Sequence, residues 1–435
     1  MKIYNMLLRL PLASKVKDKL LCKFDAIEYE NQLLAEQIID LRIQLKVLQG
    51  KKINVVFLCH RPAVWRSTKS IYEYLKKDGR VKCMIVTFPQ LTPFGTYDDE
   101  KADEYFDGNE DLVKGFDWKT KQFIDLKKLE PDYVFYQQGY NSIYIPEYRS
   151  NIVSKYAKIC YLSYFTYMNN LANGGVDDEC YQLDFLRDVS FFFAQYDSEK
   201  KYLESRLENV RGKKPMIFIT GYPKYDNLTE YKESDSKAWG KKSWQGRFRI
   251  IWTPRWTTNE NACHFFNYKD KLLDFCQNNQ DIDFLFRPHP QAWVEWAHTG
   301  ELSKREASLY RKKYDNVENA TIDSTSEYLS TFYHSDCLIT DTSSIVPEYF
   351  LSGKPIIYCY EDGSRYQFER GKGFSDGLYW VKNWKELQNT LERLKKGEDP
   401  LREKRKQLIQ ECFNMKKSAG ANIGNIIIND AYQNR

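Results

Sequence analysis

The sequence contains no run of apolar residues long enough to cross a membrane. A spanning helix needs about 18 to 20 apolar residues in a row, and the apolar patch nearest the start, Met6 to Leu8, is followed at once by Arg9 and then by Pro11. We therefore expect neither a signal peptide nor a membrane anchor. The expected location is the cytoplasm.

Paired cysteines and glycine-rich phosphate loops are also absent. The ten cysteines are scattered, with no CxxC pair, which favours buried, reduced thiols over a zinc site or a disulfide framework. No GxGxxG or GxxxxGKS/T run occurs. The sequence therefore predicts neither a dinucleotide fingerprint nor a P-loop.

An excess of charge of one sign is missing from most of the chain. Lys and Arg number 65 against 60 acidic residues, a net charge of +5, so no broad basic face for nucleic acid is expected. The first 23 residues are the exception, because Asp18 is their single acid among the bases Lys2, Arg9, Lys15, Lys17, Lys19 and Lys23. This basic arm fits an anionic membrane surface, and we expect peripheral contact with the inner face of the cell membrane.

Apolar residues recur at heptad spacing after the basic arm. The seam contains Leu20, Phe24, Ile27, Leu34, Ile38, Leu41, Leu45 and Leu48. Asn31 occupies one seam position, and a single polar seam residue is a known device for fixing the register of a two-stranded coiled coil. One interpretation is a parallel homodimer through this seam. The other is an amphipathic helix packed on its own catalytic body, and the sequence does not decide between them.

After Gly50 the pattern changes to short β-rich runs that alternate with helical stretches. The first series of expected strands is Ile53–Cys59, Val81–Phe88, Tyr133–Gln137, Lys158–Leu162, Ser190–Phe193 and Met216–Thr220. The second series is Arg249–Trp252, Phe284–Phe286, Cys337–Thr340 and Ile356–Tyr360. Such alternation predicts parallel sheets covered on both faces, with ligands beyond the carboxyl ends of the strands. The expected fold is α/β and GT-B-like, with two doubly wound Rossmann-type domains facing a cleft.

The chain divides accordingly into five segments. They are an arm and coiled-coil helix at 1–50, a first domain at 51–226, a polar linker at 227–247, a second domain at 248–397, and closing helices at 398–435. Helices that close the chain are expected at Trp384–Lys396 and Leu401–Met415.

A hydroxyl-rich turn, Thr340–Ser344, follows one expected strand and precedes an expected helix. With Ser344 as the N-cap, a proline lies in the first turn of the helix, where its missing N–H costs nothing. The hydroxyls of Thr342, Ser343 and Ser344, the free amides and the positive end of the helix dipole predict a phosphate cradle. Glu348, on the same helix face as Ser344, is a candidate for binding a ribose. The alternative is that the hydroxyls only cap the helix.

A second segment delivers two cationic side chains to a strand end. The apolar run Phe284–Phe286 is followed by Arg287 and His289, each of which precedes a proline that restricts the backbone. A guanidinium can grip a pyrophosphate with two donors, and an imidazole can bind phosphate or transfer a proton. The alternative is a structural histidine in a loop, but this rigid pair has little packing purpose. Arg287 and His289 are therefore candidate catalytic residues.

Together these segments resemble the CDP-glycerol glycerophosphotransferase family, whose members carry an RPHP element, a TDYSS-like element and a KPII-type strand. The corresponding segments here are Arg287–Pro290, Thr340–Ser344 and Lys354–Ile357, in the same order. Gly221–Asp226 is similar to the family's GxPRxD link, and Trp252–Trp256 to its APTWR-like turn. The resemblance covers about half of the chain.

The resemblance implies a donor site in the second domain and an acceptor site in the first. The residues implied to hold or flank the donor diphosphate are Arg287, His289, Ser343, Ser344, Thr253 and Arg255. The family's His-Gly element has no histidine in the comparable segment Tyr161–Asn170, which leaves the base open. His60, directly after the first expected strand, is the substitute candidate. Its alternative is a loop histidine packed on Trp65.

The implied function is transfer of a polyol phosphate, such as glycerol phosphate, from a CDP-activated donor to a hydroxyl of a surface-glycan or lipid-linked acceptor. The donor site would stabilise the leaving CMP, and a first-domain base would deprotonate the acceptor hydroxyl. No clustered Asp-x-Asp site is placed to face the expected cleft, so we expect no bound metal and no cofactor. Rivals on the same fold are a nucleotide-sugar glycosyltransferase and a nucleotide-sugar epimerase. A non-catalytic assembly subunit is the rival of a different class.

Overall fold

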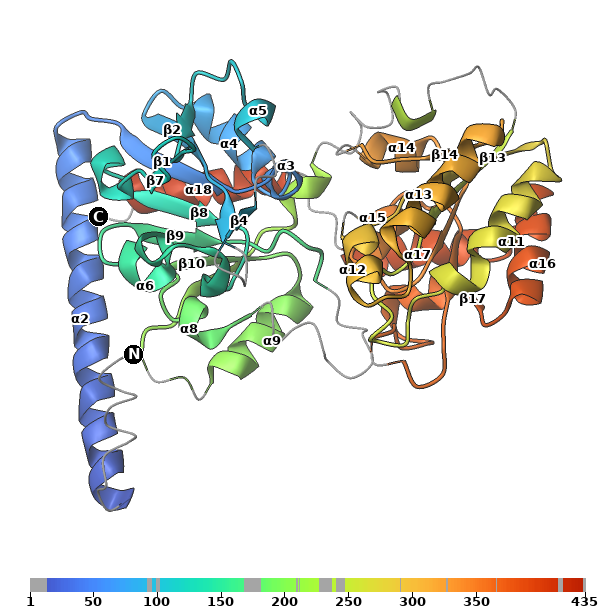
Figure 1. The fold of residues 1–435 in the computed structure, drawn as a ribbon. Coiled ribbons are helices and arrows are strands. Elements are labelled where there is room, and N and C mark those ends of the chain that lie inside the picture. Colours follow the sequence, from blue (N-terminus) through green and yellow to red (C-terminus); the bar gives the residue numbers. More distant parts are fainter. Residues whose placement is uncertain are drawn as a thin grey trace. The chain divides into compact units, whose positions relative to one another are not determined.

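The computed structural model consists of two compact units (Figure 1). It describes residues 14–91, 96–98, 102–167, 181–208, 210, 212–226, 237–239, 247–289, 291–325, 328–364, 366–413 and 418–432. Unit 1 contains the described residues of Met1–Tyr167, Asp177–Asp226 and Lys416–Arg435, and unit 2 contains those of Asn227–Met415. After building unit 2, the chain therefore returns to unit 1.

Unit 1 is built on a parallel sheet. Among the described residues, seven strands stand in the order β11, β10, β9, β8, β1, β2, β5. Their bounds are β1 (Ile53–Cys59), β2 (Val81–Thr87), β5 (Leu112–Lys114), β8 (Tyr133–Tyr136), β9 (Lys158–Tyr161), β10 (Phe191–Ala194) and β11 (Met216–Ile219). The sequence order runs outward from β1 in both directions, so the sheet is doubly wound and its switch point lies between β1 and β8.

Helices cover both faces of this sheet. One face packs against α2 (Ser14–Leu48), α4 (Lys69–Lys76) and α18 (Ala419–Tyr432). On the other face, Tyr136 and Tyr161 pack edge-on against Phe185 of α8. The remaining elements of the unit are α3 (Pro62–Trp65), α5 (Ala102–Tyr105), α6 (Ser150–Val153), α8 (Leu183–Leu186), α9 (Asp197–Leu207), β3 (Gln90–Leu91), β4 (Tyr97–Asp98), β6 (Phe116–Asp117) and β7 (Gln122–Phe123).

The helix expected after the basic arm is present as α2, and it packs on unit 1 through a stripe other than the heptad seam. Ile39 and Ile43 enter the core, at 3% and 2% exposed, and Asp40 pairs with the buried Lys158 at 2.6 Å. Every seam residue whose side chain the structure describes is exposed, namely Leu20, Ile27, Asn31, Leu34, Ile38, Leu41, Leu45 and Leu48. The helix is confirmed, whereas the coiled coil stays a prediction. Residues 1–13 of the basic arm lie outside the described residues.

The helix α18 packs against α4, from which it is far removed in sequence (Figure 1). Asp226 accepts hydrogen bonds from the backbone N–H groups of Ala419 and Gly420 at 2.8 and 2.7 Å, so it caps the start of α18. A Cβ added at Gly424 would lie 2.3 Å from the ring of Tyr74 in α4. The two helices therefore approach each other at a glycine that no larger residue can replace without movement.

Unit 2 repeats the arrangement on a second parallel sheet. Its described strands stand in the order β14, β13, β12, β15, β16, β17. Their bounds are β12 (Phe248–Thr253), β13 (Ile282–Phe286), β14 (Ala320–Ile322), β15 (Cys337–Thr340), β16 (Ile356–Cys359) and β17 (Tyr379–Val381). The switch point of this sheet lies between β12 and β15, where Thr253 stands opposite Thr340.

An aromatic core fills one face of this second sheet. Phe265 of α11 stacks on Trp296 of α12 with 4.1 Å between ring centroids, and on Trp252 of β12 at 5.7 Å. On the other face, the fully buried Arg405 of α17 donates from Nε to the carbonyl of Gly353 at 3.1 Å. The helices are α11 (Phe265–Gln277), α12 (Ala292–His298), α13 (Lys304–Lys313), α14 (Leu329–Tyr333), α15 (Ile345–Phe350), α16 (Trp384–Lys395) and α17 (Arg402–Phe413).

The strands expected from the sequence are all present, with ends shifted by at most two residues. The short strands β5, β14 and β17 were not expected, and each lies at an edge of its sheet. The two expected closing helices are α16 and α17 in unit 2, while α18 was not expected and belongs to unit 1. Of the expected linker 227–247, the structure describes residues 237–239 and 247.

Candidate functional site

Polar side chains gather where β12 and β15 end, at the switch point of unit 2. The hydroxyl of Thr253 donates to the hydroxyl of Thr340 at 2.9 Å, and Thr340 donates to the carbonyl of Thr253 at 2.8 Å. Both residues are buried. These bonds tie the strand ends together and occupy the Thr253 hydroxyl, whose contact with a substrate stays a prediction.

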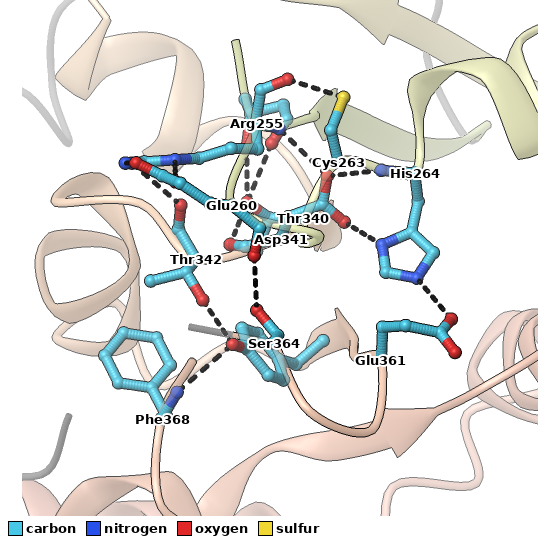
Figure 2. Close-up of polar contacts among 12 residues, drawn as sticks. Arg255, Glu260, Cys263, His264, Thr340, Asp341, Thr342, Glu361, Ser364 and Phe368 are labelled. Atoms are coloured by element: carbon cyan, nitrogen blue, oxygen red, sulfur yellow. Dashed lines mark hydrogen bonds and ion pairs between the residues drawn. The ribbon is translucent and has the colours of Figure 1, made fainter. Parts of the chain in front are cut away.

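Asp341, directly after β15, is the hub of this cluster (Figure 2). Its Oδ2 accepts hydrogen bonds from the backbone N–H groups of Arg255 at 2.9 Å and of His264 at 3.0 Å. Its Oδ1 lies 2.8 Å from Nδ1 of the His264 ring. The carboxylate is 1% exposed, and it joins the loop after β12 and the start of α11 to the turn after β15. A buried carboxylate with donors on both oxygens is a fixed negative charge.

The imidazole of His264 lies between two carboxylates. It is buried and stacks on Tyr268 with 5.6 Å between centroids, and its Nε2 lies 3.9 Å from Oε2 of Glu361. Burial works to lower the pKa of His264, but the hydrogen bond and charge of Asp341, with the charge of Glu361, raise that pKa above its ordinary value. His264 can therefore hold a positive charge at this edge of the sheet.

Arg255 has an acidic partner of its own (Figure 2). Its Nε and Nη2 donate to the two carboxylate oxygens of Glu260 at 2.5 and 2.7 Å, and its Nη1 lies 3.4 Å from the carbonyl of Thr342. The pair is a bidentate fork. A ligand phosphate at this point would compete with Glu260 for the guanidinium.

The hydroxyl-rich turn after β15 presents its three hydroxyls differently. Thr342 is buried, and its hydroxyl shares a hydrogen bond with that of Tyr358. The Oγ of Ser343 accepts from the N–H of Ile345 at 3.4 Å. Ser344 is exposed, directly precedes α15 and makes no side-chain cap bond. Ser344 is therefore the residue of the turn whose hydroxyl is best exposed to a ligand.

Arg287, after β13, is linked to Glu348 through one aromatic ring. Its guanidinium pairs with the buried Asp323 and lies 5.3 Å from the centroid of Tyr328. The hydroxyl of Tyr328 donates to Glu348, which is 5% exposed. The structure thus connects two residues that the sequence assigned to the site. A ribose that binds Glu348 as expected would compete with Tyr328 for Oε2 of that carboxylate.

His289 is exposed beyond the same strand end. Its ring stacks on Trp256 with 5.8 Å between centroids, and its Nδ1 accepts from the N–H of Gln291 at 3.2 Å. Because Trp256 directly follows Arg255, His289 lies on the β12 side of the cluster. An exposed imidazole on this turn has the access to a ligand that the buried His264 lacks.

His60 lies in unit 1, directly after β1. It is 1% exposed, and its ring centroid lies 6.1 Å from that of Phe88. Its Nε2 has no hydrogen-bond partner among the described residues. Burial, and then the charge of Arg61, lower the pKa of His60 well below its ordinary value. The ring is therefore neutral.

The sequence did not single out Asp341, His264 or Glu260. Asp341 lies inside the hydroxyl-rich turn, but Arg255 and His264, which it binds, are 86 and 77 residues away. The signals in the sequence were an acid directly after a predicted strand and a histidine directly before the aromatic start of a helix. Neither signal shows that Asp341 and His264 bind each other.

Two doubly wound parallel sheets in one chain, with polar residues at the carboxyl ends of the strands, place the protein in the GT-B class. The model of the CDP-Glycerol:Poly(glycerophosphate) glycerophosphotransferase family matches residues 182–428, more than half of the chain. The chain therefore belongs to this family. The resemblance found in the sequence motifs is confirmed.

One curated relative is the minor teichoic acid biosynthesis protein GgaB of Bacillus subtilis (strain 168), which is 26% identical over 185 residues. The match covers 39% of this chain and 18% of that relative, so it spans less than a fifth of the length of GgaB.

Solved structures share the fold. The wall teichoic acid polymerase TagF matches 97% of this chain and 98% of that chain, with a TM-score of 0.56 and 17% identity. A TagF variant soaked with CDPG matches 93% and 98%, with a TM-score of 0.56 and 18% identity. UDP-GlcNAc 2-epimerase from Neisseria meningitidis, bound to UDP-GlcNAc, matches 88% and 100%, with a TM-score of 0.54 and 15% identity. At these identities the similarity establishes the fold alone.

Three further features concern the described residues only. No helix there has both the length and the apolar character that crossing a membrane requires. No group of three or more His, Cys, Asp and Glu side chains there could hold a metal ion. The cysteines described are free thiols, most of them buried. The absence of a required metal or cofactor stays a prediction.

Proposed function

We propose that the protein transfers a polyol phosphate, such as glycerol phosphate, from a CDP-activated donor to a hydroxyl of a surface-glycan or lipid-linked acceptor. Membership of the glycerophosphotransferase family supports the donor class. The polar cluster at the ends of β12, β13 and β15 supports a diphosphate site in unit 2. Unit 2 is then the donor-binding domain, and unit 1 is the acceptor domain.

The reaction breaks the phosphoanhydride bond of the donor and forms a phosphate ester bond to the acceptor. The acceptor hydroxyl oxygen attacks the phosphorus that carries the polyol, and the bond from that phosphorus to the bridging oxygen breaks. CMP leaves with the bonding electron pair, and the hydroxyl proton passes to a base. Because negative charge grows on the CMP phosphate, fixed positive groups beside it stabilise the transition state.

The observation that carries this proposal is the set of cationic and hydroxyl groups at the ends of three neighbouring strands. Arg287 and His289 follow β13, Arg255 follows β12, and Ser344 follows β15. In the proposed complex, Arg287 and His289 hold the CMP phosphate, while Ser344 and the amides of its turn contact the diphosphate. Arg255 exchanges Glu260 for a phosphate oxygen, and His264 adds positive charge behind the site.

His60 of unit 1 is the proposed base. Its imidazole is neutral, and its Nε2 has no partner among the described residues. A neutral nitrogen of this kind can accept the proton of a hydroxyl. In this assignment, His60 takes the role of the histidine in the family's His-Gly element, which this chain lacks.

Product analysis with a panel of donors tests the proposal. The protein is incubated with CDP-linked and UDP-linked donors, with and without an acceptor oligomer, and the nucleotides and the oligomer mass are measured. We expect CMP release and growth of the oligomer by one polyol-phosphate unit. Release of UDP with addition of a sugar would establish a glycosyltransferase instead.

The same panel tests an epimerase as the second candidate function. The fold shared with UDP-GlcNAc 2-epimerase favours this candidate, and isomerisation of a UDP-sugar would establish it. A protein that binds CDP but turns over no donor would be an assembly subunit.

We also propose that α2 joins two copies of the chain. Ion pairs such as Lys46 with Asp132 hold one side of the helix on unit 1, while the described apolar side chains of the seam stay exposed, from 37% at Leu20 to 74% at Leu48. The packing on unit 1 therefore leaves the described part of the heptad stripe for a second copy, and Asn31 within it favours two strands.

Sedimentation of the full chain and of a seam variant tests this dimer. Leu34→Glu with Leu41→Glu should give a folded monomer, and a parent chain that is already monomeric at micromolar concentration contradicts the dimer. Contact of the basic arm with anionic vesicles is tested by removing residues 1–13 only, because Ile39 and Ile43 further along α2 belong to the core.

A further inference from the structure

Polar side chains without partners lie at the switch point of unit 1. His60 follows β1 and Gln138 follows β8, and both are 1% exposed. The Nε2 of His60 and both polar side-chain atoms of Gln138 are buried and have no hydrogen-bond partner among the described residues. Buried polar groups are nearly always paired in folded proteins, so these atoms mark a place where a partner is missing.

Strand register and aromatic contacts bring the two side chains together. β1 and β8 pair in parallel, and their register carried forward to the residues after each strand sets His60 opposite Gln138. The ring of Phe88 lies 6.1 Å from that of His60 and 6.0 Å from that of Tyr144. The hydroxyl of Tyr144 lies 3.4 Å from the backbone carbonyl of Gln138. His60 and Gln138 are therefore neighbouring residues of one cluster.

Arg61, the residue after His60, adds a positively charged side chain. Arg61 is half-buried, its guanidinium lies 5.6 Å from the ring centroid of Tyr164, and its Nε is buried without a partner among the described residues. No described carboxylate pairs with Arg61, in contrast to Arg255 of unit 2, which is forked on Glu260. Its positive charge is therefore not neutralised within the part of the chain that the structure describes.

We infer that His60, Arg61 and Gln138 bind the end group of the acceptor, a polyol that carries a phosphodiester. The inference rests on the proposed function, because it assigns the acceptor half of that reaction to unit 1. A carboxamide offers an acceptor oxygen and two donor hydrogens, and a neutral imidazole nitrogen adds one contact, which together match the hydroxyls of a polyol. The guanidinium matches the phosphate.

The roles within this site follow from the chemistry of each group. His60 receives the reacting hydroxyl, Gln138 holds a neighbouring hydroxyl, and Arg61 holds the phosphate that links the end unit to the rest of the acceptor. Ligand entry requires movement of side chains around the two buried groups, and Arg61 can move because no ion pair among the described residues restrains it.

The preceding glutamine provides a matched control. Gln137 is as deeply buried as Gln138, but its Nε2 donates to the hydroxyl of Thr68 at 3.3 Å. Its backbone carbonyl accepts from the N–H of Tyr164 at 3.0 Å. The side chain of Gln137 is therefore part of the fold, whereas that of Gln138 is left to a ligand.

Gln138→Leu tests the site, because it removes the polar atoms and keeps much of the volume. We expect the KM for a glycerol phosphate oligomer to rise at least about tenfold. The affinity for CDP and the slow release of CMP without acceptor should stay unchanged. The melting temperature should stay or rise, since an unpaired buried amide has become apolar. Gln137→Leu should instead lower the melting temperature and leave the acceptor KM unchanged.

Calorimetry with a glycerol phosphate dimer examines the same site without turnover. Arg61→Gln and Gln138→Leu should each weaken the dimer about tenfold or more, and inorganic phosphate should be sensitive to Arg61→Gln alone. Dimer binding and acceptor KM that are unchanged in both variants would overturn the inference and leave the unpaired atoms as a buried hydration site. If no donor is turned over but the dimer binds in a Gln138-dependent way, the proposed function fails and the binding site stands.

Discussion

The switch points of the two units share a topology and differ in how their polar groups are paired. In unit 2, Asp341 has donors on both carboxylate oxygens, and Arg255 is forked on Glu260. In unit 1, His60 and Gln138 carry polar atoms without partners among the described residues. A polar network whose groups are all hydrogen-bonded is rigid before a ligand arrives. Polar groups that lack hydrogen-bond partners can obtain them from the ligand. The comparison indicates a donor site whose backbone is fixed around Asp341 while Arg255 exchanges Glu260 for a phosphate, and an acceptor site that its ligand completes.

Removal of the Asp341 side chain, the hub of the polar cluster in unit 2, should cause the largest loss of folding stability. Asp341→Ala leaves the His264 ring and two backbone amides buried without an acceptor, and breaking a buried charged pair costs roughly 3 to 5 kcal/mol. Urea unfolding followed by tryptophan fluorescence should show that loss or an unfolded unit 2. Asp341→Asn, which keeps the shape and one acceptor oxygen, should lose less. An unchanged unfolding midpoint in Asp341→Ala would mean that the network does not hold the site.

Loss of the exposed imidazole should reduce turnover without unfolding. His289→Ala is expected to lower kcat on the order of 10²-fold, the scale for removal of a charge stabiliser in the transition state. His298, an exposed histidine at the end of α12, gives the control, and His298→Ala should have the parent's kcat. Arg287→Ala should lose both turnover and stability, because it leaves Asp323 buried and unpaired. A fully active His289→Ala would remove His289 from the donor site.

The exposed hydroxyl of the turn after β15 should contribute a smaller amount. Ser344→Ala removes one hydrogen bond to a charged phosphate, and such a bond is worth roughly 1.5 to 3 kcal/mol. Calorimetric titration should therefore show CDP affinity reduced by about tenfold or somewhat more. The melting temperature should not change, because Ser344 makes no cap bond. Equal CDP affinity in parent and variant would leave Ser344 as a surface residue.

The pH dependence of stability should be the smallest effect, with opposite signs in the two units. The pKa of His264 is raised on folding, so its contribution is fully present below the unfolded pKa of about 6.5 and fades as pH rises through the raised value. The pKa of His60 is lowered, so stability is lost as pH falls through about 6.5, where the unfolded imidazole takes up a proton.

Thermal unfolding between about pH 5 and pH 9 separates these two contributions. Relative to the parent, His264→Asn should lose most stability at the acidic end. His60→Phe should be relatively more stable there. Equal pH profiles for the two variants would contradict the contrast between the two switch points.

The central strands could be predicted from the sequence because they are buried on both faces and read as unbroken apolar runs. The edge strands β5, β14 and β17 could not, since each is only three residues long, whereas the edge strand β11 is four residues long and wholly apolar. A strand that borders water on one side needs no continuous apolar run.

The site residues also divide into those that the sequence could predict and those that it could not. Arg287, His289 and Ser344 could be predicted because each follows an apolar strand within a few residues, so the signal is local. The hub could not, because Asp341 meets His264 across 77 residues. Likewise, the attachment of α18 to unit 1 depends on Asp226 and on the space at Gly424, which no local pattern reveals.

The capping of α18 by Asp226 also bears on how the protein is made. Translation delivers the strands of unit 1 first, then the whole of unit 2, and only afterwards the helix whose Ile423, Ile427 and Ile428 complete the core of unit 1. Domains generally fold as units while the chain emerges from the ribosome. The described residues of unit 2 all lie in one stretch of the sequence, Asn227–Met415, so this unit can finish on that schedule. The half of the molecule that is synthesised first is therefore the last to be completed, and the part of its core that α18 covers stays exposed until that helix arrives.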